Sequence, residues 1–384
     1  MAEYQRLDEV CHINMGQSPD SKSYNQVGDG LPFFQGNADF GIMYPETRVW
    51  CSSPTKVVEP GTLLISVRAP IGALNFSKER SCIGRGLAGI TPRQDVDLKY
   101  IYYCLKSQKE ELDAKGTGST FKAIAKNVLG ETSVKIVSKT AQEQIVQILD
   151  RVSSMVDARK QQLGELDNLI KARFVELFGD LASPECKWKV EKLVDACVDP
   201  DDIKCGPFGT QLNKDEYQSD GVAVWEIPQI NSRFSTIPTH YLSESKAKQL
   251  ESYSIKPGDI AMSRKGNVGK CAVFPSDFEA GIIHSDVLRI RVDSRCALPV
   301  FMMHQLHYSR AVQHQIELVS SGAIMAGINV TKLKQICVHI PPLKLQEQFA
   351  TFVKHVDKSK VVVQNHIKQT IAKRIFLDRS GCHV

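Results

Sequence analysis

The sequence predicts a mixed α/β (α+β) fold that is built twice, with one long helix after each copy. Three observations predict it. The segment "TAQEQIVQILDRV" at 140–152 returns as "KLQEQFATFVKHV" at 344–356, an offset of 204 residues. The segment "PGTLLISVRAPIG" at 60–72 returns as "PGDIAMSRKGNVG" at 257–269, an offset of 197 residues. After each copy, apolar residues recur at steps of four and three, the pattern of a helix with one apolar stripe.

The two matches favour an internal duplication with pseudo-twofold symmetry. Laying 116–150 over 320–354 without a gap gives eight identities in 35 positions, including the whole Gln-Glu-Gln block. In the shorter match the coincident or similar pairs are Ser66 and Ser263, Gly72 and Gly269, and Arg68 and Lys265. Two Pro-Gly turns can agree by accident, but two matches in the same order favour duplication. Because the offsets differ by seven residues, we expect one or two loop insertions between the copies.

Short runs rich in β-branched and apolar residues, bounded by Gly and Pro, predict the strands of each copy. In the first copy these are "LLISV" (63–67) and "SVKIV" (133–137), and a helix is expected from Leu98 to Asp113. In the second copy they are "VAVWEI" (222–227), "DIAMS" (259–263) and "VLRIRV" (287–292). Neither copy shows the regular strand-helix alternation of a Rossmann sheet.

Two long helices are predicted, from Ala141 to about Phe178 and from Leu345 to Leu377. The apolar stripe of the first is Ile145, Leu149, Val152, Val156, Leu163, Leu166, Ile170 and Leu177, and that of the second is Phe349, Phe352, Val353, Val356, Val363, Ile367, Ile371 and Ile375. A lone stripe must be buried, so we expect the helices to pair as an antiparallel coiled coil that separates two globular domains. Alternatively, each helix lies on its own domain. The expected boundaries are 1–139, 140–179, 180–342 and 343–378.

Composition places the chain among ordinary soluble proteins. It has 384 residues, 42% hydrophobic and 24% charged, with a formal net charge of +5 that permits nucleic-acid binding without arguing for it. No apolar run is long enough to span a membrane, and the first residues do not resemble a secretory signal. The 11 cysteines show neither zinc-ligand spacing nor a disulfide framework. We therefore expect reduced thiols in a cytoplasmic protein.

The sequence predicts no catalytic residues and no metal site in this chain. "GNVGKC" at 266–271 lacks the spacing and the hydroxyl residue of a phosphate-binding loop. "HIPPL" at 339–343 has apolar neighbours where an amino-methyltransferase motif carries a polar residue and an aromatic ring. No nuclease motif of paired acids followed by Lys is evident. The chain is expected to be non-catalytic.

Gly-flanked loops carry side chains that can contact DNA bases, because Arg and Lys suit guanine and Asn and Gln suit adenine. In the first copy they are Gln35, Asn37, Arg68, Arg85, Thr120 and Lys122. In the second copy they are Gln211, Asn213, Lys214, Gln229, Asn231, Arg233, Arg264, Lys265, Asn267 and His284. For any single residue a solvated loop position is the alternative. The matched basic positions, Arg68 and Lys265, are the strongest candidates.

The order of these motifs resembles the DNA-specificity subunit of type I restriction-modification enzymes over essentially the whole chain. The resemblance is carried by "GSTFKAI" (118–124), "AQEQIVQILDRV" (141–152), "KARFVELFGD" (171–180) and "PPLKLQEQFATFV" (341–353). The sequence departs from the family pattern at "GAIMAGI" (322–328) and at "KRIFLDRSG", which puts a shared role for Lys122 in doubt. The resemblance implies that each domain is a target-recognition domain for one half of a bipartite double-stranded DNA target.

The same resemblance implies the partners. The two helices act as a spacer and dock two modification (methyltransferase) subunits, and restriction (ATP-dependent translocase and nuclease) subunits complete the complex. S-adenosylmethionine, ATP and magnesium belong to those partners, and this chain binds no cofactor. The candidate docking residues are Gln142, Glu143, Gln144, Gln346, Glu347 and Gln348. Helix capping is an alternative role for these residues.

Two functions of other classes remain open at this point. One is a single-chain restriction or modification enzyme with an unrecognised site. The other is a coiled-coil scaffold that does not bind DNA, which salt-dependent binding to duplex DNA would exclude.

Overall fold

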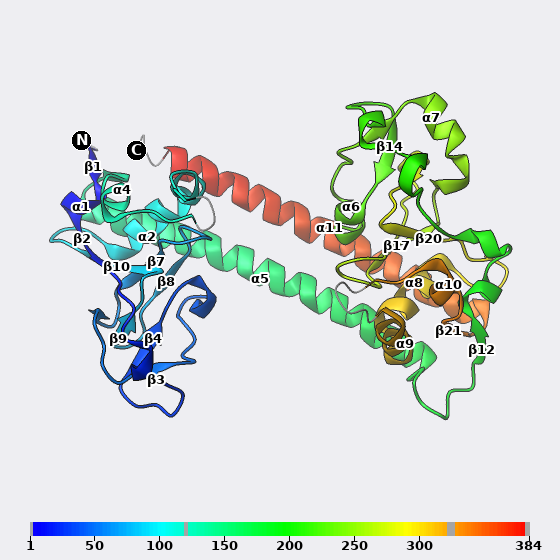
Figure 1. Cartoon of the computed structure of the whole chain (residues 1–384), viewed down its shortest axis with the longest axis horizontal. Coiled ribbons are helices and arrows are strands. Elements are labelled where there is room, and N and C mark those ends of the chain that lie inside the picture. Colours follow the sequence, from blue (N-terminus) through cyan, green and yellow to red (C-terminus); the bar gives the residue numbers. More distant parts are fainter. Residues whose placement is uncertain (1–2, 119–121, 321–326, 381–384) are drawn as a thin grey trace. The chain divides into compact units, whose positions relative to one another are not determined.

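The computed structural model describes residues 3–118, 122–320 and 327–380, with side chains described as far as residue 372. It divides into two compact units. Unit 1 comprises Met1–Lys160 with Gln364–Val384, and unit 2 comprises Gln161–Val363. The long helices α5 (Lys139–Phe178) and α11 (Leu343–Ser380), green and red in Figure 1, therefore each contribute residues to both units. The sequence predicted both helices, and each begins two residues earlier than expected.

The described residues of unit 1 form three sheets, with strand orders β2-β10-β7-β8, β3-β5-β4-β9-β6 and β1-β11. Its strands are β1 (Glu3–Arg6), β2 (Cys11–Met15), β3 (Tyr24–Asn25), β4 (Leu31–Phe34), β5 (Trp50–Cys51), β6 (Val57–Val58), β7 (Leu63–Ser66), β8 (Leu74–Phe76), β9 (Ser81–Ile83), β10 (Leu87–Pro92) and β11 (Ser133–Ile136). Its short helices are α1 (Leu7–Val10), α2 (Leu98–Ser107), α3 (Lys109–Ala114) and α4 (Lys126–Gly130).

Unit 2 also has three sheets within its described residues, with strand orders β13-β20-β17-β18, β15-β14-β19-β16 and β12-β21. Its strands are β12 (Lys189–Lys192), β13 (Ile203–Cys205), β14 (Val222–Trp225), β15 (Tyr241–Leu242), β16 (Ser254–Ile255), β17 (Ile260–Ser263), β18 (Cys271–Val273), β19 (Gly281–Ile283), β20 (Val287–Ile290) and β21 (Cys337–Ile340). Its short helices are α6 (Ile227–Asn231), α7 (Glu244–Gln249), α8 (Pro299–Tyr308), α9 (Arg310–Ser320) and α10 (Val330–Lys334).

The two units repeat one topology. The four-stranded sheet β2-β10-β7-β8 of unit 1 corresponds strand for strand to β13-β20-β17-β18 of unit 2, and β1-β11 corresponds to β12-β21. In the remaining sheet of each unit, a parallel pair lies at the centre, β4 with β9 and β14 with β19. The sequence-matched glycines also share their conformation, because Gly72 and Gly269 have φ angles of 82° and 83°.

The expectation of one or two insertions between the two matched segments was wrong, because the seven residues by which their offsets differ are added at three points. The offset between equivalent elements is 197 residues for β7 and β17, 200 for β10 and β20, 201 for α2 and α8, and 204 for α4 and α10. The steps therefore lie between β18 and β19, between β20 and α8, and between α9 and α10. The first two of these points lie in loops, where added residues disturb no core packing.

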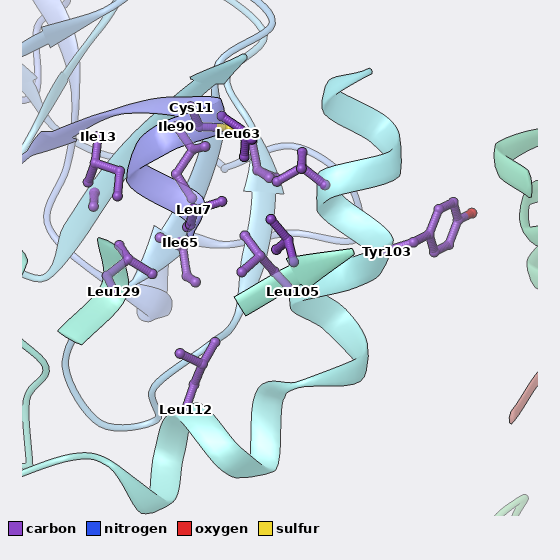
Figure 2. Close-up of a cluster of buried hydrophobic side chains, with 14 of the residues drawn as sticks. Leu7, Cys11, Ile13, Leu63, Ile65, Ile90, Tyr103, Leu105, Leu112 and Leu129 are labelled. Carbon is purple, nitrogen blue, oxygen red and sulfur yellow. The ribbon is translucent and has the colours of Figure 1, made fainter. Parts of the chain in front are cut away.

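The core of unit 1 fills the space between the four-stranded sheet and helix α2. Figure 2 shows Leu7, Leu63, Ile65, Ile90 and Leu105 grouped there, and all five are fully buried. Tyr103 points away from this group on the other side of α2 (Figure 2), where its hydroxyl donates to Asp150 of α5 at 2.6 Å. Burial, followed by this contact, raises the pKa of Tyr103 to about 12.

The single helix expected from Leu98 to Asp113 is two helices, α2 and α3, that meet at Gln108. Gln108 leaves the helical conformation with φ −99° and ψ 11°, and its side-chain amide donates to the carbonyl of Ser133 at 3.0 Å. The bend allows Leu105 and Leu112 to be buried in the same core. Side-chain periodicity does not report such a break, because apolar residues continue across it.

Within unit 2, the end of α5 packs against the start of α11 in an aromatic cluster. Phe174 and Phe178 contact Phe349, with ring centroids 5.4 and 5.6 Å apart, and Phe301 of α8 joins them. Farther along, Lys360 donates to Asp167 at 2.7 Å. From Phe178 to Asp167 the residue numbers of α5 decrease, while those of their partners on α11 increase from Phe349 to Lys360. The two segments therefore run antiparallel.

Of the 15 predicted stripe residues with described side chains, seven are buried, seven are half-buried and one is exposed. Leu149, Val156 and Ile170 of α5 are at most 8% exposed, and Val353 and Val356 of α11 are at most 6% exposed. Ile371 departs from the prediction with 40% exposure, and Ile375 lies outside the described side chains. Lys360 occupies the stripe between Val356 and Val363, where its ammonium group is paired with Asp167 and Asp357.

Candidate nucleic-acid interface

Polar side chains gather in unit 1 where the parallel strands β4 and β9 end. Gln35 follows the last residue of β4, and Arg85 follows β9 by two residues. Because parallel strands finish at the same edge of a sheet, the two side chains start from neighbouring backbone. Gly86 makes the approach possible, since a Cβ there would lie 2.3 Å from the carbonyl oxygen of Gln35.

Arg68 and Lys122 join the same edge through backbone hydrogen bonds. The amide of Val67 donates to the carbonyl of Gly86 at 2.9 Å, which brings the residue after it, Arg68, beside the β9 turn. The amide of Ala69 donates to the carbonyl of Lys122 at 3.0 Å. Thr120 lies outside the described residues.

These residues form one cleft. Its lining includes four of the six candidates predicted for the first copy, namely Gln35, Asn37, Arg68 and Arg85. Arg68 and Arg85 are exposed, and no carboxylate of the described residues lies within the 4.0 Å ion-pair distance of either guanidinium. Asp39 also lines the cleft, but its carboxylate accepts the amides of Gln35 and Gly36, at 2.7 and 3.2 Å. The cleft therefore offers two unpaired cations.

The same backbone contacts build an equivalent strand-end site in unit 2. His284 donates its amide to the carbonyl of Trp225 as Gly84 does to Phe34, at 2.9 and 2.8 Å. The amide of Arg264 donates to the carbonyl of Asp286 as Val67 does to Gly86. The matched bridges Arg68 with Ala123 and Lys265 with Gly327 complete the correspondence. The equivalent positions are Gln35 and Glu226, Arg68 and Lys265, Arg85 and Ser285, and Gly86 and Asp286.

The site in unit 2 carries carboxylates that are paired with cations and imidazoles. Glu226 contacts His240 Nδ1 at 2.8 Å and lies 4.0 Å from His284 Nε2. Asp286 pairs with Lys265 at 2.7 Å and lies 3.9 Å from His284 Nδ1. The predicted candidates Lys265 and His284 are thus brought together with two acidic residues that the sequence did not suggest.

Arg264 is held close to this cluster but in a different manner. Its guanidinium lies 4.8 Å from the ring centroid of Phe208 and donates to the carbonyl of Ser285 at 3.3 Å. It also contacts Cys205 Sγ at 3.5 Å. Burial raises the pKa of the Cys205 thiol, and the positive charge of Arg264 opposes that rise.

One predicted DNA contact of the second copy, Gln229, is corrected by the structure. Gln229 is only 2% exposed, and its side chain bonds to the amide of Glu226 and the carbonyl of Ile237, so it cannot reach a base. Arg233 is exposed and pairs with Asp167 of α5 at 3.6 Å, and its prediction as a DNA contact stays a prediction. Both residues lie in a short helix and its exit, where sequence cannot tell which face is buried.

The other candidates of the second copy lie on short helices and turns. Asn213 and Lys214 are exposed at the start of a short 3-10 helix, and Asn267 is exposed in the turn after Lys265. Gln211 accepts the amide of Phe208 and the hydroxyl of Tyr253, both at 3.1 Å. Asn231 is half-buried with its Oδ1 enclosed. No contact of these residues joins them to Glu226 or Asp286 in the described part of the chain.

Glu226, Asp286, His240 and Phe208 were not among the residues predicted from the sequence. A search for groups that suit guanine and adenine passes over carboxylates, although Glu and Asp accept from the amino group of cytosine. The signal that would have found two of them is positional. Glu226 and Asp286 take the places of Gln35 and Gly86 once the copies are aligned strand by strand.

The first Gln of each Gln-Glu-Gln block is a structural residue, which corrects its prediction as a docking residue. Gln142 and Gln346 are both 0% exposed. Gln142 Oε1 accepts the amide of Asp97 at 2.8 Å, and its Nε2 donates to the carbonyls of Asp95 and Val137. Gln346 makes the three equivalent bonds to Leu298, Cys296 and Pro341. These hydrogen bonds join each long helix to the loop before α2 or α8, so neither side chain is available to a partner.

The remaining four docking candidates, Glu143, Gln144, Glu347 and Gln348, are exposed. Glu347 and Gln348 line a groove of unit 2 together with Arg173, Lys344, Thr351, Phe352 and His355. The Arg173 guanidinium lies 5.7 Å from the ring centroid of Phe352 and pairs with Glu176 at 2.8 Å. The lining of the groove contains the Phe352 ring and charged side chains of both signs.

Among the described residues, no group of three or more His, Cys, Asp or Glu side chains is arranged to hold a metal ion. The search for membrane spans, over the same residues, finds no helix with the length and apolar character to cross a bilayer.

Two copies of one mixed helix-and-sheet domain, each with a polar strand-end site and each followed by a long helix, define a tandem recognition-domain protein. The chain belongs to the type I restriction modification DNA specificity domain family, whose family model matches residues 2–168 and 202–373.

Named relatives agree with this membership. The chain is 38% identical over 165 residues to a provisionally named type I restriction enzyme MjaX specificity subunit of Methanocaldococcus jannaschii, covering 43% of this chain and 39% of the relative. It is 18% identical over 398 residues to the type I restriction enzyme EcoBI specificity subunit of Escherichia coli, covering 96% and 81%. The first match spans about two fifths of the relative's length.

A crystal structure of a type I restriction-modification system S subunit from M. genitalium has the same fold. The superposition covers 98% of this chain and 95% of that one, with a TM-score of 0.54 and 14% identity. At that identity the likeness concerns the fold alone.

Proposed function

We propose that this chain is the DNA-binding specificity subunit of a type I restriction-modification complex, in which each unit recognises one half of a bipartite duplex target. The observation that carries the proposal is the pair of equivalent strand-end sites, each bearing cationic and hydrogen-bonding side chains at the same backbone positions. Two copies of one binding site in one chain suit a ligand that presents two separate sites on one continuous molecule.

Double-stranded DNA is such a ligand. Arg68 and Arg85 in the first cleft, and Lys265 with Glu226 and Asp286 in the second, supply partners for phosphates and base edges. The helices α5 and α11 pair as an antiparallel coiled coil that sets the number of base pairs between the half-sites. The antiparallel contacts of Asp167 and Phe174 with Lys360 and Phe349 support this arrangement.

The chain contributes recognition and its partners contribute the chemistry. Adenine methylation with S-adenosylmethionine belongs to two modification subunits, and ATP- and magnesium-dependent translocation and cleavage belong to restriction subunits in the cytoplasm. The exposed residues Glu143, Gln144, Glu347 and Gln348 are the contacts we assign to the modification subunits.

The test of DNA recognition is methylation mapping by single-molecule sequencing. DNA from cells that express this chain with its modification subunit is compared with DNA from cells that express the modification subunit alone. We expect a split adenine-methylated motif only when this chain is present. A modification subunit that is active and co-purifies with this chain, yet produces no new motif, would contradict the proposal.

Docking is tested by filling the groove of unit 2. Thr351→Arg places a long charged side chain among the groove residues, and we expect it to reduce co-purification of the modification subunit. Ser359→Arg is the matched control, because Ser359 is an exposed small residue of the same helix outside the groove lining. Equal loss of co-purification in both variants would show that the groove is not the docking surface.

A further inference from the structure

The two strand-end sites agree in charge at one of four equivalent positions and differ at the other three, and this difference divides their residues by role. Arg68 and Lys265 occupy equivalent positions and are both cationic. Gln35 and Arg85 of the first site are replaced by Glu226 and Ser285 in the second. A residue type that is the same in both sites is expected to contact a part of the DNA that both half-sites have. A residue type that differs between the sites is expected to contact the part in which the half-sites differ.

What any two stretches of duplex DNA share is the phosphate backbone. Phosphate contacts position a protein on the duplex without carrying sequence information. Arg68 is exposed at the rim of the first cleft, next to the backbone of Lys122. Lys265 remains 45% exposed despite its ion pair with Asp286, so its ammonium group retains donors for a phosphate oxygen.

What distinguishes two half-sites is their bases. Arg85 is an exposed arginine without a carboxylate partner among the described residues, and a free guanidinium fork matches the O6 and N7 acceptors of guanine. Beside it, Gln35 is also exposed, and its side chain can donate or accept. The first cleft is therefore suited to a base edge that presents acceptors.

The second site has the opposite character. Glu226 replaces the amide of Gln35 with a carboxylate, and Asp286 adds a second carboxylate where unit 1 has Gly86. Their cationic and imidazole neighbours, Lys265, His240 and His284, hold both carboxylates at the strand ends. Carboxylate oxygens accept from an exocyclic amino group, which cytosine presents at N4 and adenine at N6 in the major groove.

We propose, on the basis of the proposed function, that Arg68 and Lys265 are phosphate contacts common to both units, whereas Arg85 and Glu226 set the specificity of each half-site. Arg85 recognises a guanine in the half-site of unit 1. Glu226 recognises an amino-bearing base, cytosine or adenine, in the half-site of unit 2.

The experiment maps methylated motifs for single variants co-expressed with the modification subunit. Arg85→Gln is expected to relax one guanine position of one half-site, with discrimination falling on the order of tenfold or more, and to leave the other half-site unchanged. Glu226→Gln is expected to alter one position of the other half-site. Arg68→Gln and Lys265→Gln are expected to lower the extent of methylation at every site while the motif stays the same.

Controls separate these effects from misfolding and from failure of the proposed function. Arg80→Gln removes an exposed arginine just before the opposite end of β9, and both motif and extent should match the wild type. Each variant should also retain the wild-type melting temperature. If Arg85→Gln lowers methylation uniformly without changing the motif, or if Arg68→Gln changes the motif, the division of roles is overturned. A wild-type chain that gives no motif overturns the proposed function itself.

Discussion

At the residue scale, one buried glutamine in each copy joins the start of the long helix to a neighbouring loop. Gln142 and Gln346 each make three hydrogen bonds to the backbone before their helix or before α2 or α8. The neighbouring Glu143 and Glu347 are exposed. The Gln-Glu-Gln block that the two copies share therefore contains one structural residue and two surface residues.

Replacing either buried glutamine should destabilise the unit that contains it. Gln142→Leu leaves the amide of Asp97 and the carbonyls of Asp95 and Val137 without their partner. We expect a loss of about 2–4 kcal/mol in the free energy of unfolding of unit 1, because each buried unsatisfied group costs about 1–3 kcal/mol. Urea denaturation measures it, with Glu143→Ala as the exposed control. A loss equal to that of the control would contradict the structural role.

A buried histidine should make unit 2 sensitive to mild acid. Burial lowers the pKa of His304 to about 4, and its Nδ1 donates to the carbonyl of Val300 at 2.7 Å. The unfolded chain binds a proton near pH 6.5 while the folded chain does not, so stability is complete above pH 6.5 and falls as the pH drops toward 4. The loss is about 3 kcal/mol.

The His304 prediction is checked by comparing unfolding free energies of the wild type and His304→Gln between pH 7 and 4. Gln cannot titrate, so the variant should lack this part of the pH dependence. Arg233, His307 and Lys360 also disfavour the charged imidazole and remain in both proteins. Parallel curves for the two proteins would show that His304 is not the titrating group.

At the scale of elements, each long helix buries its stripe through specific partners. In unit 2 the partners of α5 are the aromatic residues of α8 and α11. Figure 1 shows how much longer α5 and α11 are than every other labelled helix. Helical propensity does not hold such helices in place; packing of the buried stripe does.

Removing one ring from the aromatic cluster should destabilise unit 2. Phe174 is 2% exposed and contacts Phe178, Phe301 and Phe349. Phe174→Ala is expected to cost about 3–5 kcal/mol, the usual range for a buried Phe. Its sequence neighbour Val175 is 50% exposed, so Val175→Ala should change stability by about 0.5 kcal/mol or less. Thermal unfolding of both variants provides the comparison, and similar melting temperatures for the two would contradict the packing assignment.

At the scale of the whole molecule, the chain consists of two units with separate cores. Leu105 of α2 and Leu306 of α8 occupy equivalent positions and are both fully buried. A protein with two cores need not unfold in one step. Matched substitutions in the two cores can therefore report on each unit separately.

Leu105→Ala should weaken unit 1 and Leu306→Ala should weaken unit 2, each by about 2–5 kcal/mol. Hydrogen exchange followed by mass spectrometry is the measurement, because it assigns the loss of protection to peptides. Peptides from β7 and β10 should exchange faster in the first variant, and peptides from β17 and β20 in the second. Faster exchange of both sets in both variants would show that the two cores unfold together.

The duplication, the two long helices and several strands could be predicted from the sequence, because these features depend on local patterns. A 204-residue offset, a 3.6-residue period and Pro-Gly punctuation are all visible without folding the chain. The sequence also identified Gln35, Asn37, Arg68 and Arg85, which the structure gathers in one cleft.

Which polar residues face solvent, and which neighbours they contact, depends on the tertiary structure. Gln142, Gln229 and Gln346 are buried, although their sequence context is polar, because backbone groups distant in the chain satisfy their amides. Glu226 and Asp286 became site residues because β14 and β19 are parallel and end at the same edge. Register and burial depend on contacts between segments far apart in the sequence, and no local pattern contains that information.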